Sequence, residues 1–153
     1  MTFPVTEHTV KTARHTTGYL ACGAEQGPLL IFCHGWPELS LSWRHQLPAF
    51  AALGFRCVAP DMRGYGRSST YTRHEDFAQE QIVQDMVELL ASLGRERTVW
   101  IGHDWGSPVV WRAVLTACSV SGNGIAPETA MEFAAGTTEL SRPGSRSAPG
   151  PTE

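Results

Sequence analysis

Long hydrophobic runs, an excess of one charge and paired cysteines are all missing from this sequence of 153 residues. No uninterrupted apolar run approaches the ~20 residues that a membrane-spanning helix needs. The 12 basic and 15 acidic residues leave a net charge of −3 and no basic patch that would attract nucleic acid or anionic lipid. The N-terminus shows no secretory signal pattern. The sequence therefore predicts a soluble, cytoplasmic chain with no nucleic-acid partner and no membrane partner.

The cysteines are widely spaced and form no C-x-x-C pair. They are Cys22, Cys33, Cys57 and Cys118. Two of them lie in apolar runs, where cysteine is commonly a small buried side chain. A disulfide framework or a zinc site is therefore not expected, and the sequence implies no metal and no organic cofactor.

Short apolar runs predict the strands of an α/β fold. Buried strands are expected at Leu29–Cys33, Phe55–Ala59 and Thr98–Ile101, because each run is continuously apolar and bounded by turn residues. Two weaker strands are expected around Thr9–Ala13 and Tyr19–Cys22. Helical patterns separate the buried runs, so a doubly wound, mostly parallel sheet is predicted.

Three helical regions are expected along the chain. Ser42 is expected to cap the first, and Pro48 should bend it or divide it into two short helices. The second follows Asp76 and Gln79, whose spacing resembles a capping arrangement. The third is an apolar helix over residues 107–117. Beyond it the composition changes, since 18 of the last 35 residues are Gly, Pro, Ser or Thr, and residues 119–153 are predicted to be a low-complexity, irregular tail.

The sharpest chemical signal is the sequence Gly102-His103-Asp104-Trp105-Gly106. Glycines on both sides of a central nucleophile are typical of a tight turn from strand to helix, which lifts one side chain clear of the sheet. A carboxylate in that position suits attack on a saturated carbon, which forms an ester of the enzyme that is later hydrolysed. A structural aspartate that caps a helix after a glycine turn is the alternative, and this motif alone leaves both open.

A second motif, His34-Gly35-Trp36-Pro37-Glu38, directly follows the first buried strand. The glycine lets the backbone turn across the end of the sheet, so that a following N–H group can face the nucleophile. We expect His34 to make a structural hydrogen bond more readily than to transfer a proton.

A third motif, Asp61 to Ser69, is rich in glycine and again follows a strand. It lacks the residue order of a phosphate-binding loop, so a nucleotide site is not expected. We interpret it as a scaffold loop in which Asp61 and Arg63 fix neighbouring turns.

Together, the segments HGWPE, SWRHQLPAF, APDMRGYGRSS and GHDWGS resemble the N-terminal half of the α/β-hydrolase-fold epoxide hydrolases, over about residues 5–117. The resemblance implies an incomplete α/β-hydrolase fold, with residues 1–118 as the N-terminal part of the domain. It implies that Asp104 opens a small-molecule epoxide and that Trp36 and Trp105 supply the backbone N–H groups of the oxyanion hole. It also implies a supporting loop of His34, Gly35 and Pro37, with a cis peptide before the proline. Haloalkane dehalogenases are close relatives that share GHDWG, but Trp36 and Glu38 favour the epoxide hydrolases.

The sequence departs from that family after the nucleophile. The family uses epoxide-polarising tyrosines, an acid and a histidine that activates water, yet no histidine and no tyrosine follows Asp104. His103 is expected to point into the protein and His34 to lie on the oxyanion side, so neither is expected to replace the missing base. The predicted function is therefore an epoxide hydrolase-like hydrolase impaired in turnover. The alternative from another class is a non-catalytic, truncated fragment or interaction module. The strand at Thr98–Ile101 lacks a following partner, which predicts self-association through an exposed sheet edge.

Overall fold

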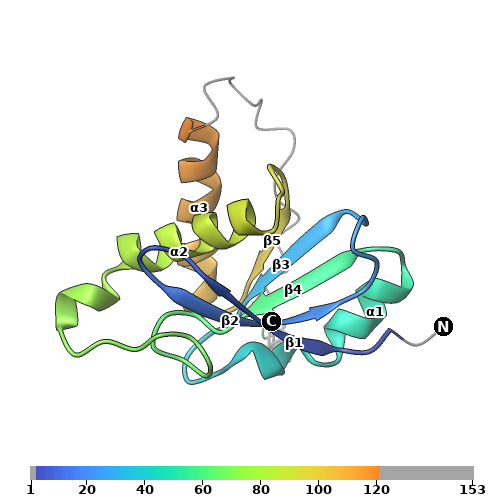
Figure 1. Ribbon diagram of the computed structural model, residues 1–153, viewed down its shortest axis with the longest axis horizontal. Coiled ribbons are helices and arrows are strands. Elements are labelled where there is room, and N and C mark those ends of the chain that lie inside the picture. The colour runs from blue at the N-terminus through green and yellow to red at the C-terminus, as the bar shows by residue number, and fades with distance from the viewer. Residues whose placement is uncertain (1–2, 121–153) are drawn as a thin grey trace, which may run out of the picture.

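The protein forms one mixed sheet with helices on both faces. The structure, a computed structural model, describes residues 3–120 (Figure 1). The sheet has five strands in the order β1-β2-β4-β3-β5. In chain order they are β1 (Thr6–Lys11), β2 (Thr16–Cys22), β3 (Leu29–Cys33), β4 (Arg56–Pro60) and β5 (Val99–Gly102).

The strands β3, β4 and β5 run parallel to one another, and β1 and β2 run antiparallel to their neighbours. The prediction of a buried strand at Thr98–Ile101 is only partly met, because Trp100 alone is buried in β5. β3 lies between β4 and β5 and pairs in parallel with both. β2 pairs antiparallel with β1 and with β4. The predicted α/β class and the mostly parallel sheet are confirmed. Because parallel strands end at the same edge, the segments that follow β3, β4 and β5 meet there.

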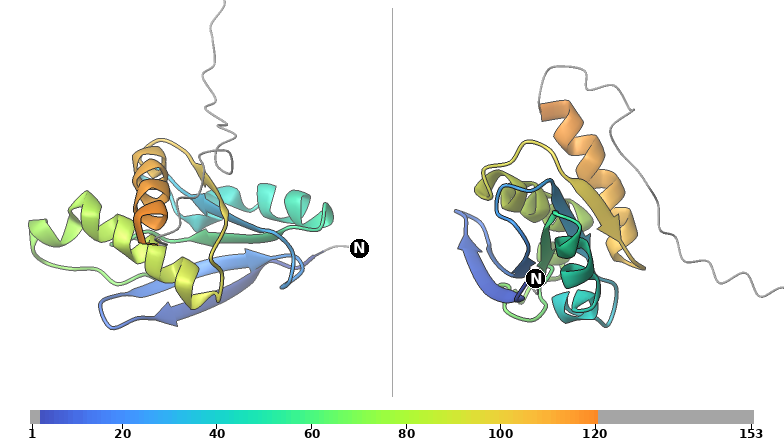
Figure 2. Two further views of the ribbon diagram at one scale, coloured as in Figure 1. Left: turned by 90° about the horizontal axis from the view of Figure 1, so that it is seen from above. Right: turned by 90° about the vertical axis from the view of Figure 1, so that its right-hand side faces the viewer.

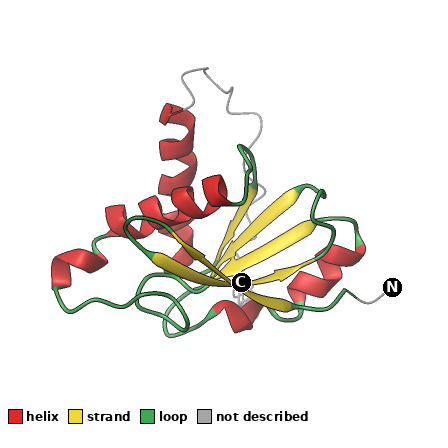
Figure 3. Cartoon of the chain, viewed as in Figure 1, coloured by secondary structure: helices red, strands yellow, loops and turns green. Residues whose placement is uncertain are grey.

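Helices cover the two faces of the sheet unequally. α1 (Gln46–Ala52) lies on one face, and α2 (Gln79–Ser92) and α3 (Gly106–Val120) lie on the other (Figure 2). Short 3₁₀ helices precede α1 and α2, namely η1 (Ser40–Trp43) and η2 (His74–Phe77). Figure 3 shows the helices and strands by colour, with β1 and β2 at one end of the sheet.

The side chains of β3 alternate between two hydrophobic clusters. Leu29, Ile31 and Cys33 pack with α2 and α3, whereas Leu30 and Phe32 pack with α1. All five are nearly inaccessible to solvent. A strand that is buried on both faces reads as a continuous apolar run, which is why its bounds agree with the prediction.

The predicted helix caps are wrong. Ser42 lies inside η1, and neither η1 nor α1 has a side-chain cap. Asp76 lies inside η2, and α2 follows Ala78 without a side-chain cap. The division of the first helical region into two short helices is confirmed, with Pro48 in the first turn of α1, where a missing N–H group costs little.

The last helix continues through Val120, two residues beyond the predicted boundary at 118. The rest of the predicted irregular tail, residues 121–153, lies outside the described residues. Within the described part, none of the helices is long and apolar enough to cross a membrane.

Candidate active site

Asp104 lies at the turn between β5 and α3, in a backbone conformation that L-residues rarely adopt. Its φ angle is +51°, and among the described non-glycine residues it alone has a positive φ. Such a conformation costs about 1–3 kcal/mol and persists because the surrounding structure enforces it. The strain presents the carboxylate above the edge of the sheet, beside the first turn of α3.

Glycines make this turn possible because other backbone segments approach it closely. A Cβ atom on Gly35 would lie 2.6 Å from the Cβ of Asp104. One on Gly102 would lie 2.7 Å from the carbonyl oxygen of Gly106, and one on Gly106 would collide with the carbonyl oxygen of Cys33. The glycines on both sides of Asp104 and the glycine after β3 are therefore steric requirements of the same turn.

The loop after β3 brings a backbone donor to the carboxylate. The N–H group of Trp36 donates to Oδ1 of Asp104 at 3.0 Å. This bond and a second from the N–H group of Trp105 hold the pKa of Asp104 below its ordinary value. The carboxylate is therefore ionised at neutral pH and accepts hydrogen bonds from two backbone N–H groups.

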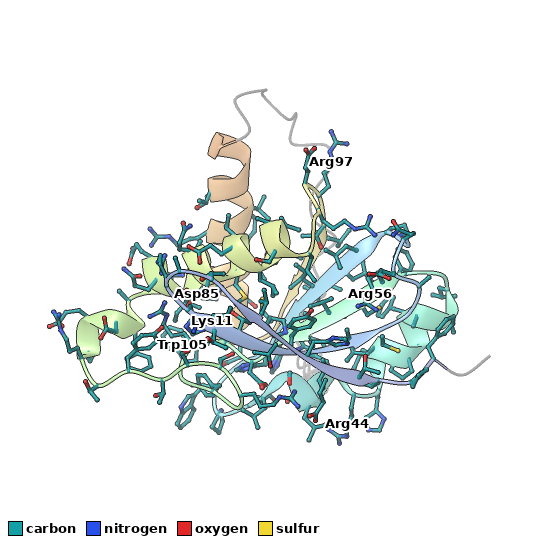
Figure 4. The ribbon with its side chains drawn as sticks, in the orientation of Figure 1. Lys11, Arg44, Arg56, Asp85, Arg97 and Trp105 are labelled. Atoms are coloured by element: carbon teal, nitrogen blue, oxygen red, sulfur yellow. The ribbon has the colours of Figure 1, made fainter. Side chains whose placement is uncertain are left out.

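The bond between Trp36 and Pro37 is cis, as the family resemblance implied. Trp36 and Trp105 are 65% and 66% exposed, so both residues flanking the carboxylate contact solvent. Trp105 is labelled in Figure 4. The loop closes on itself where the N–H group of Glu38 donates to the carbonyl oxygen of Gly35 at 3.1 Å.

His34 is completely buried and joins two loops. Its Nε2 accepts the N–H group of Met62 at 3.0 Å, which requires Nδ1 to carry the proton, and Nδ1 then donates to the carbonyl oxygen of Gly35 at 2.8 Å. Burial lowers the pKa of His34, so the ring is neutral at pH 7. Both nitrogens are occupied by backbone groups, an arrangement that suits a structural histidine.

Asp61 and Arg63 tie the third motif to its neighbours. Oδ1 of Asp61 accepts the N–H group of Ser40 at 2.8 Å, and Oδ2 accepts that of Arg67 at 3.1 Å. Arg63 donates twice to Asp85 of α2, at 2.6 and 2.8 Å. The scaffold interpretation of this loop is therefore confirmed.

His103 does not point into the protein, contrary to expectation. Its side chain is 63% exposed, and Nδ1 lies 3.5 Å from Oε2 of Glu38. The ring instead faces Glu38 in the loop that follows β3, and the proximity of His103 helps to lower the pKa of Asp104. The sequence analysis missed this contact, since Glu38 was considered only as a sign of family membership.

A pocket of about 360 Å³ opens beside Asp104, on the side of the sheet that carries α2 and α3. Aromatic and aliphatic side chains form most of its wall, among them Trp36, Tyr65, Phe77, Ile82 and Trp105. Its size lies within the range of small-molecule sites. No group of three or more metal-ligating side chains was found among the described residues.

Comparisons with known proteins agree with this geometry. Residues 28–128 match the family model described as "alpha/beta hydrolase fold". Epoxide hydrolase A of Mycobacterium tuberculosis is 46% identical over 110 residues, which are 72% of this chain and 34% of the relative. Bifunctional epoxide hydrolase 2 of Sus scrofa is 48% identical over 89 residues, which are 58% of this chain and 16% of the relative.

Solved structures agree as well. The crystal structure of epoxide hydrolase A from Mycobacterium thermoresistibile matches with a TM-score of 0.69 at 40% identity, covering 72% of this chain and 34% of that one. This chain thus spans about a third of the length of the two mycobacterial relatives. On the matched family model, the sheet and the turn at Asp104, the chain belongs to the alpha/beta hydrolase fold family, and its relatives are named epoxide hydrolases.

Proposed function

We propose that this chain carries the nucleophilic half of an epoxide hydrolase site, with Asp104 as the nucleophile. The observation that carries the proposal is the ionised carboxylate of Asp104, raised on a strained turn and held by the N–H group of Trp36 at 3.0 Å. The names of the relatives support an epoxide as the substrate class.

In the first step, the second carboxylate oxygen of Asp104 attacks a carbon of the epoxide ring. The C–O bond of the ring breaks, and the ring oxygen leaves as an alkoxide that takes a proton from solvent. The product is a hydroxyalkyl ester of Asp104. Oδ1 keeps its hydrogen bond to Trp36 throughout, which orients the attacking oxygen.

The second step is hydrolysis of that ester by water. The oxyanion of the tetrahedral intermediate forms on the oxygen that faces the N–H groups of Trp36 and Trp105, where backbone donors stabilise it. Two histidines lie near the turn, and we propose that neither activates water. His34 is occupied by backbone groups, and His103 is held by Glu38, whose Oε2 lies 3.5 Å from its Nδ1. No histidine follows His103 in the sequence. A general base typically contributes ~10²–10⁴ in rate, so we propose that the ester forms and then persists.

Intact-mass spectrometry tests both steps. The chain is incubated with an aryl epoxide such as styrene oxide, and we expect the mass of one epoxide to be added. Peptide mapping should place the adduct on Asp104, and hydroxylamine should remove it because it is an ester. Asp104→Asn should abolish this adduct, whereas Glu75→Gln, at an exposed carboxylate that pairs with Arg73, should leave it unchanged.

Adducts at cysteine or histidine alone, with none at Asp104, would contradict the proposed nucleophile. Steady release of diol over many turnovers, lost in Asp104→Asn, would support the nucleophile and contradict the proposed arrest at the ester. Absence of both adduct and diol would favour the alternative of a non-catalytic hydrolase-fold fragment.

A further inference from the structure

Two cysteines that the proposed chemistry does not use lie directly opposite each other in the sheet. Cys22, the last residue of β2, pairs in register with Cys57 of β4. Both belong to the hydrophobic cluster on the α1 face, where they are 1% and 0% exposed. Cys33 lies on the opposite face of the sheet, in the cluster packed by α2 and α3.

The hydrogen-bonding pattern places the Cα atoms of Cys22 and Cys57 at a distance that a disulfide can span. The N–H group of Arg56 points toward β3, where it donates to the carbonyl oxygen of Pro28 at 2.9 Å. Successive N–H groups of a strand alternate in direction, so the N–H group of Cys57 points toward β2. Cys22 and Cys57 are therefore a hydrogen-bonded antiparallel pair, whose Cα atoms are about 5.5 Å apart. Disulfides span Cα separations of roughly 4.4–6.8 Å.

We propose that Cys22 and Cys57 form a reversible disulfide that links β2 to β4 when the chain meets a peroxide. The Cys22 thiolate attacks hydrogen peroxide, which gives a sulfenic acid and hydroxide. The Cys57 thiolate then attacks that sulfur, so that an S–S bond forms and the S–O bond breaks. In total, two thiols and one peroxide give one disulfide and two waters, and the electron pair passes from sulfur to the peroxide oxygens.

The segment that precedes β1 controls access to this pair. The Cys22 thiol donates to the carbonyl oxygen of Phe3 at 3.4 Å, and the Phe3 ring packs against the same cluster. Burial raises the pKa of the Cys22 thiol, and burial together with Cys22 raises the pKa of Cys57 to about 12. The thiols are therefore protonated and slow to react until the cover opens.

The geometry also explains why the bond would be reversible. Side chains of directly opposed residues project from the same face, with Cβ atoms about 4.5–5.5 Å apart, whereas a relaxed disulfide has them roughly 3.5–4.5 Å apart. Closing the bond draws the two strands together and strains it, and strained disulfides are readily reduced. The position of Cys22 at the end of β2 lets the backbone adjust.

Peptide mapping of the full chain tests this proposal. The chain is treated with hydrogen peroxide, and remaining thiols are blocked with iodoacetamide under denaturing conditions. Cleavage after Glu25, Glu38, Arg56 and Arg112 then leaves each cysteine on a separate peptide. We expect the linked peptides to carry Cys22 and Cys57, with a mass loss of two hydrogen atoms that dithiothreitol reverses. Cys33→Ala should retain the link, and Cys57→Ala should abolish it.

The same oxidation in guanidinium chloride distinguishes a disulfide that the strand pairing directs from one that forms by chance in an unfolded chain. In an unfolded chain the shorter loop closes more readily, so Cys22 should link to Cys33 about fivefold more often than to Cys57. The folded chain should show the reverse preference. This comparison needs no substitution, so it holds even if Cys57→Ala fails to fold. Equal patterns in the two conditions, or no linked peptide in the folded chain, would overturn the proposal.

Discussion

The backbone N–H group of Trp36 lies 3.0 Å from Oδ1 of Asp104, although 68 positions separate the two residues in the chain. The contact exists because β3 and β5 are parallel neighbours and end at the same edge of the sheet. It joins the two motifs that the family resemblance relies on into one site. Reactivity at Asp104 therefore depends on the edge of the sheet where β3 and β5 end, and on the loops and helices that pack against that edge.

The first prediction concerns Gly35→Ala. The added methyl group would lie 2.6 Å from the Cβ and 2.9 Å from Oδ1 of Asp104, so the loop and the carboxylate must separate. A displacement of a reacting group by about 1 Å can cost about 10²-fold in rate. We expect the rate of Asp104 alkylation by an epoxide to fall at least tenfold, measured by intact mass. Gly54→Ala is the control for backbone strain alone: its φ of +94° disfavours a side chain, but no atom lies within 4 Å of the added methyl group. An equal loss there would contradict the steric explanation.

The second prediction concerns the buried ion pair of Arg63 with Asp85. Their side chains are 3% and 0% exposed, so removal of one charge leaves the other buried without compensation. Asp85 also binds Arg14 and lies on the α2 side of the sheet (Figure 4). We expect Asp85→Ala to lower the free energy of unfolding by about 3–5 kcal/mol, measured by urea denaturation.

The matched control is an ion pair whose two side chains are exposed to solvent. Arg73 and Glu75 form an ion pair at 3.0 Å, but their side chains are 73% and 72% exposed. Solvent screens such pairs, so Glu75→Ala should cost less than about 0.5 kcal/mol. Similar losses in both variants would show that burial does not set the energy of the ion pairs in this protein.

The third prediction concerns pH. Burial lowers the pKa of His15 and of His34 below 6.5, so in acid the unfolded chain binds protons that the folded chain does not. Folding stability should therefore be fully present above pH 6.5 and should decrease as the pH falls toward the lower, folded-state values. The slope cannot exceed about 1.4 kcal/mol per pH unit for each histidine.

Urea denaturation between pH 5.5 and 7.5 measures this dependence. His15→Gln should reduce the slope, because one of the two buried rings is removed. His74→Gln, at an exposed position in η2, should leave the slope unchanged. Stability that does not vary over this pH range would contradict the prediction.

The fourth prediction concerns the edge of the sheet at β5. In the described part of the chain β5 pairs with β3 alone. The N–H group of His103 donates toward β3, so the main-chain groups of Trp100 and Gly102 face the open side. Unpaired edges promote association, and we expect the chain to form oligomers in size-exclusion chromatography at micromolar concentration.

A charge on that edge should oppose association. Val99 is 40% exposed at the start of β5, and Val99→Lys should shift the elution toward the monomer. Leu53→Lys places the same charge on a residue that is 74% exposed at the end of α1, and it should have no effect. A monodisperse monomer of the unmodified chain would contradict the prediction.

Sequence reasoning succeeded where the signal was local and failed where it depended on distant contacts. The bounds of Leu29–Cys33 agree with the structure, because a strand buried on both faces is apolar at every position. The caps at Ser42 and Asp76 were wrong, because both residues lie within 3₁₀ turns that propensity does not distinguish from helix starts. The contact of His103 with Glu38 depends on the parallel pairing of β3 with β5, and a single sequence does not specify that pairing.

In the site too, features that depend on local residue type were predicted, and features that depend on distant contacts were missed. Gly35 and the glycines around Asp104 were predicted from turn chemistry, because a glycine in such a motif marks a position where neighbouring atoms leave no room for a Cβ atom. The apposition of Cys22 and Cys57 was missed, because it depends on the antiparallel pairing of β2 with β4. No periodicity in either segment specifies that pairing.

The turn at Asp104 takes its shape from atoms that do not belong to the aspartate side chain. Gly35, Gly102 and Gly106 allow the close backbone approaches, and the end of β3 contacts the start of α3 through main-chain atoms. The residue at position 104 must tolerate a φ of +51°, but nothing in the turn requires a carboxylate. The same scaffold therefore accepts a different side chain at position 104, so that the alkylation proposed for the aspartate would give way to acyl transfer if a serine stood there.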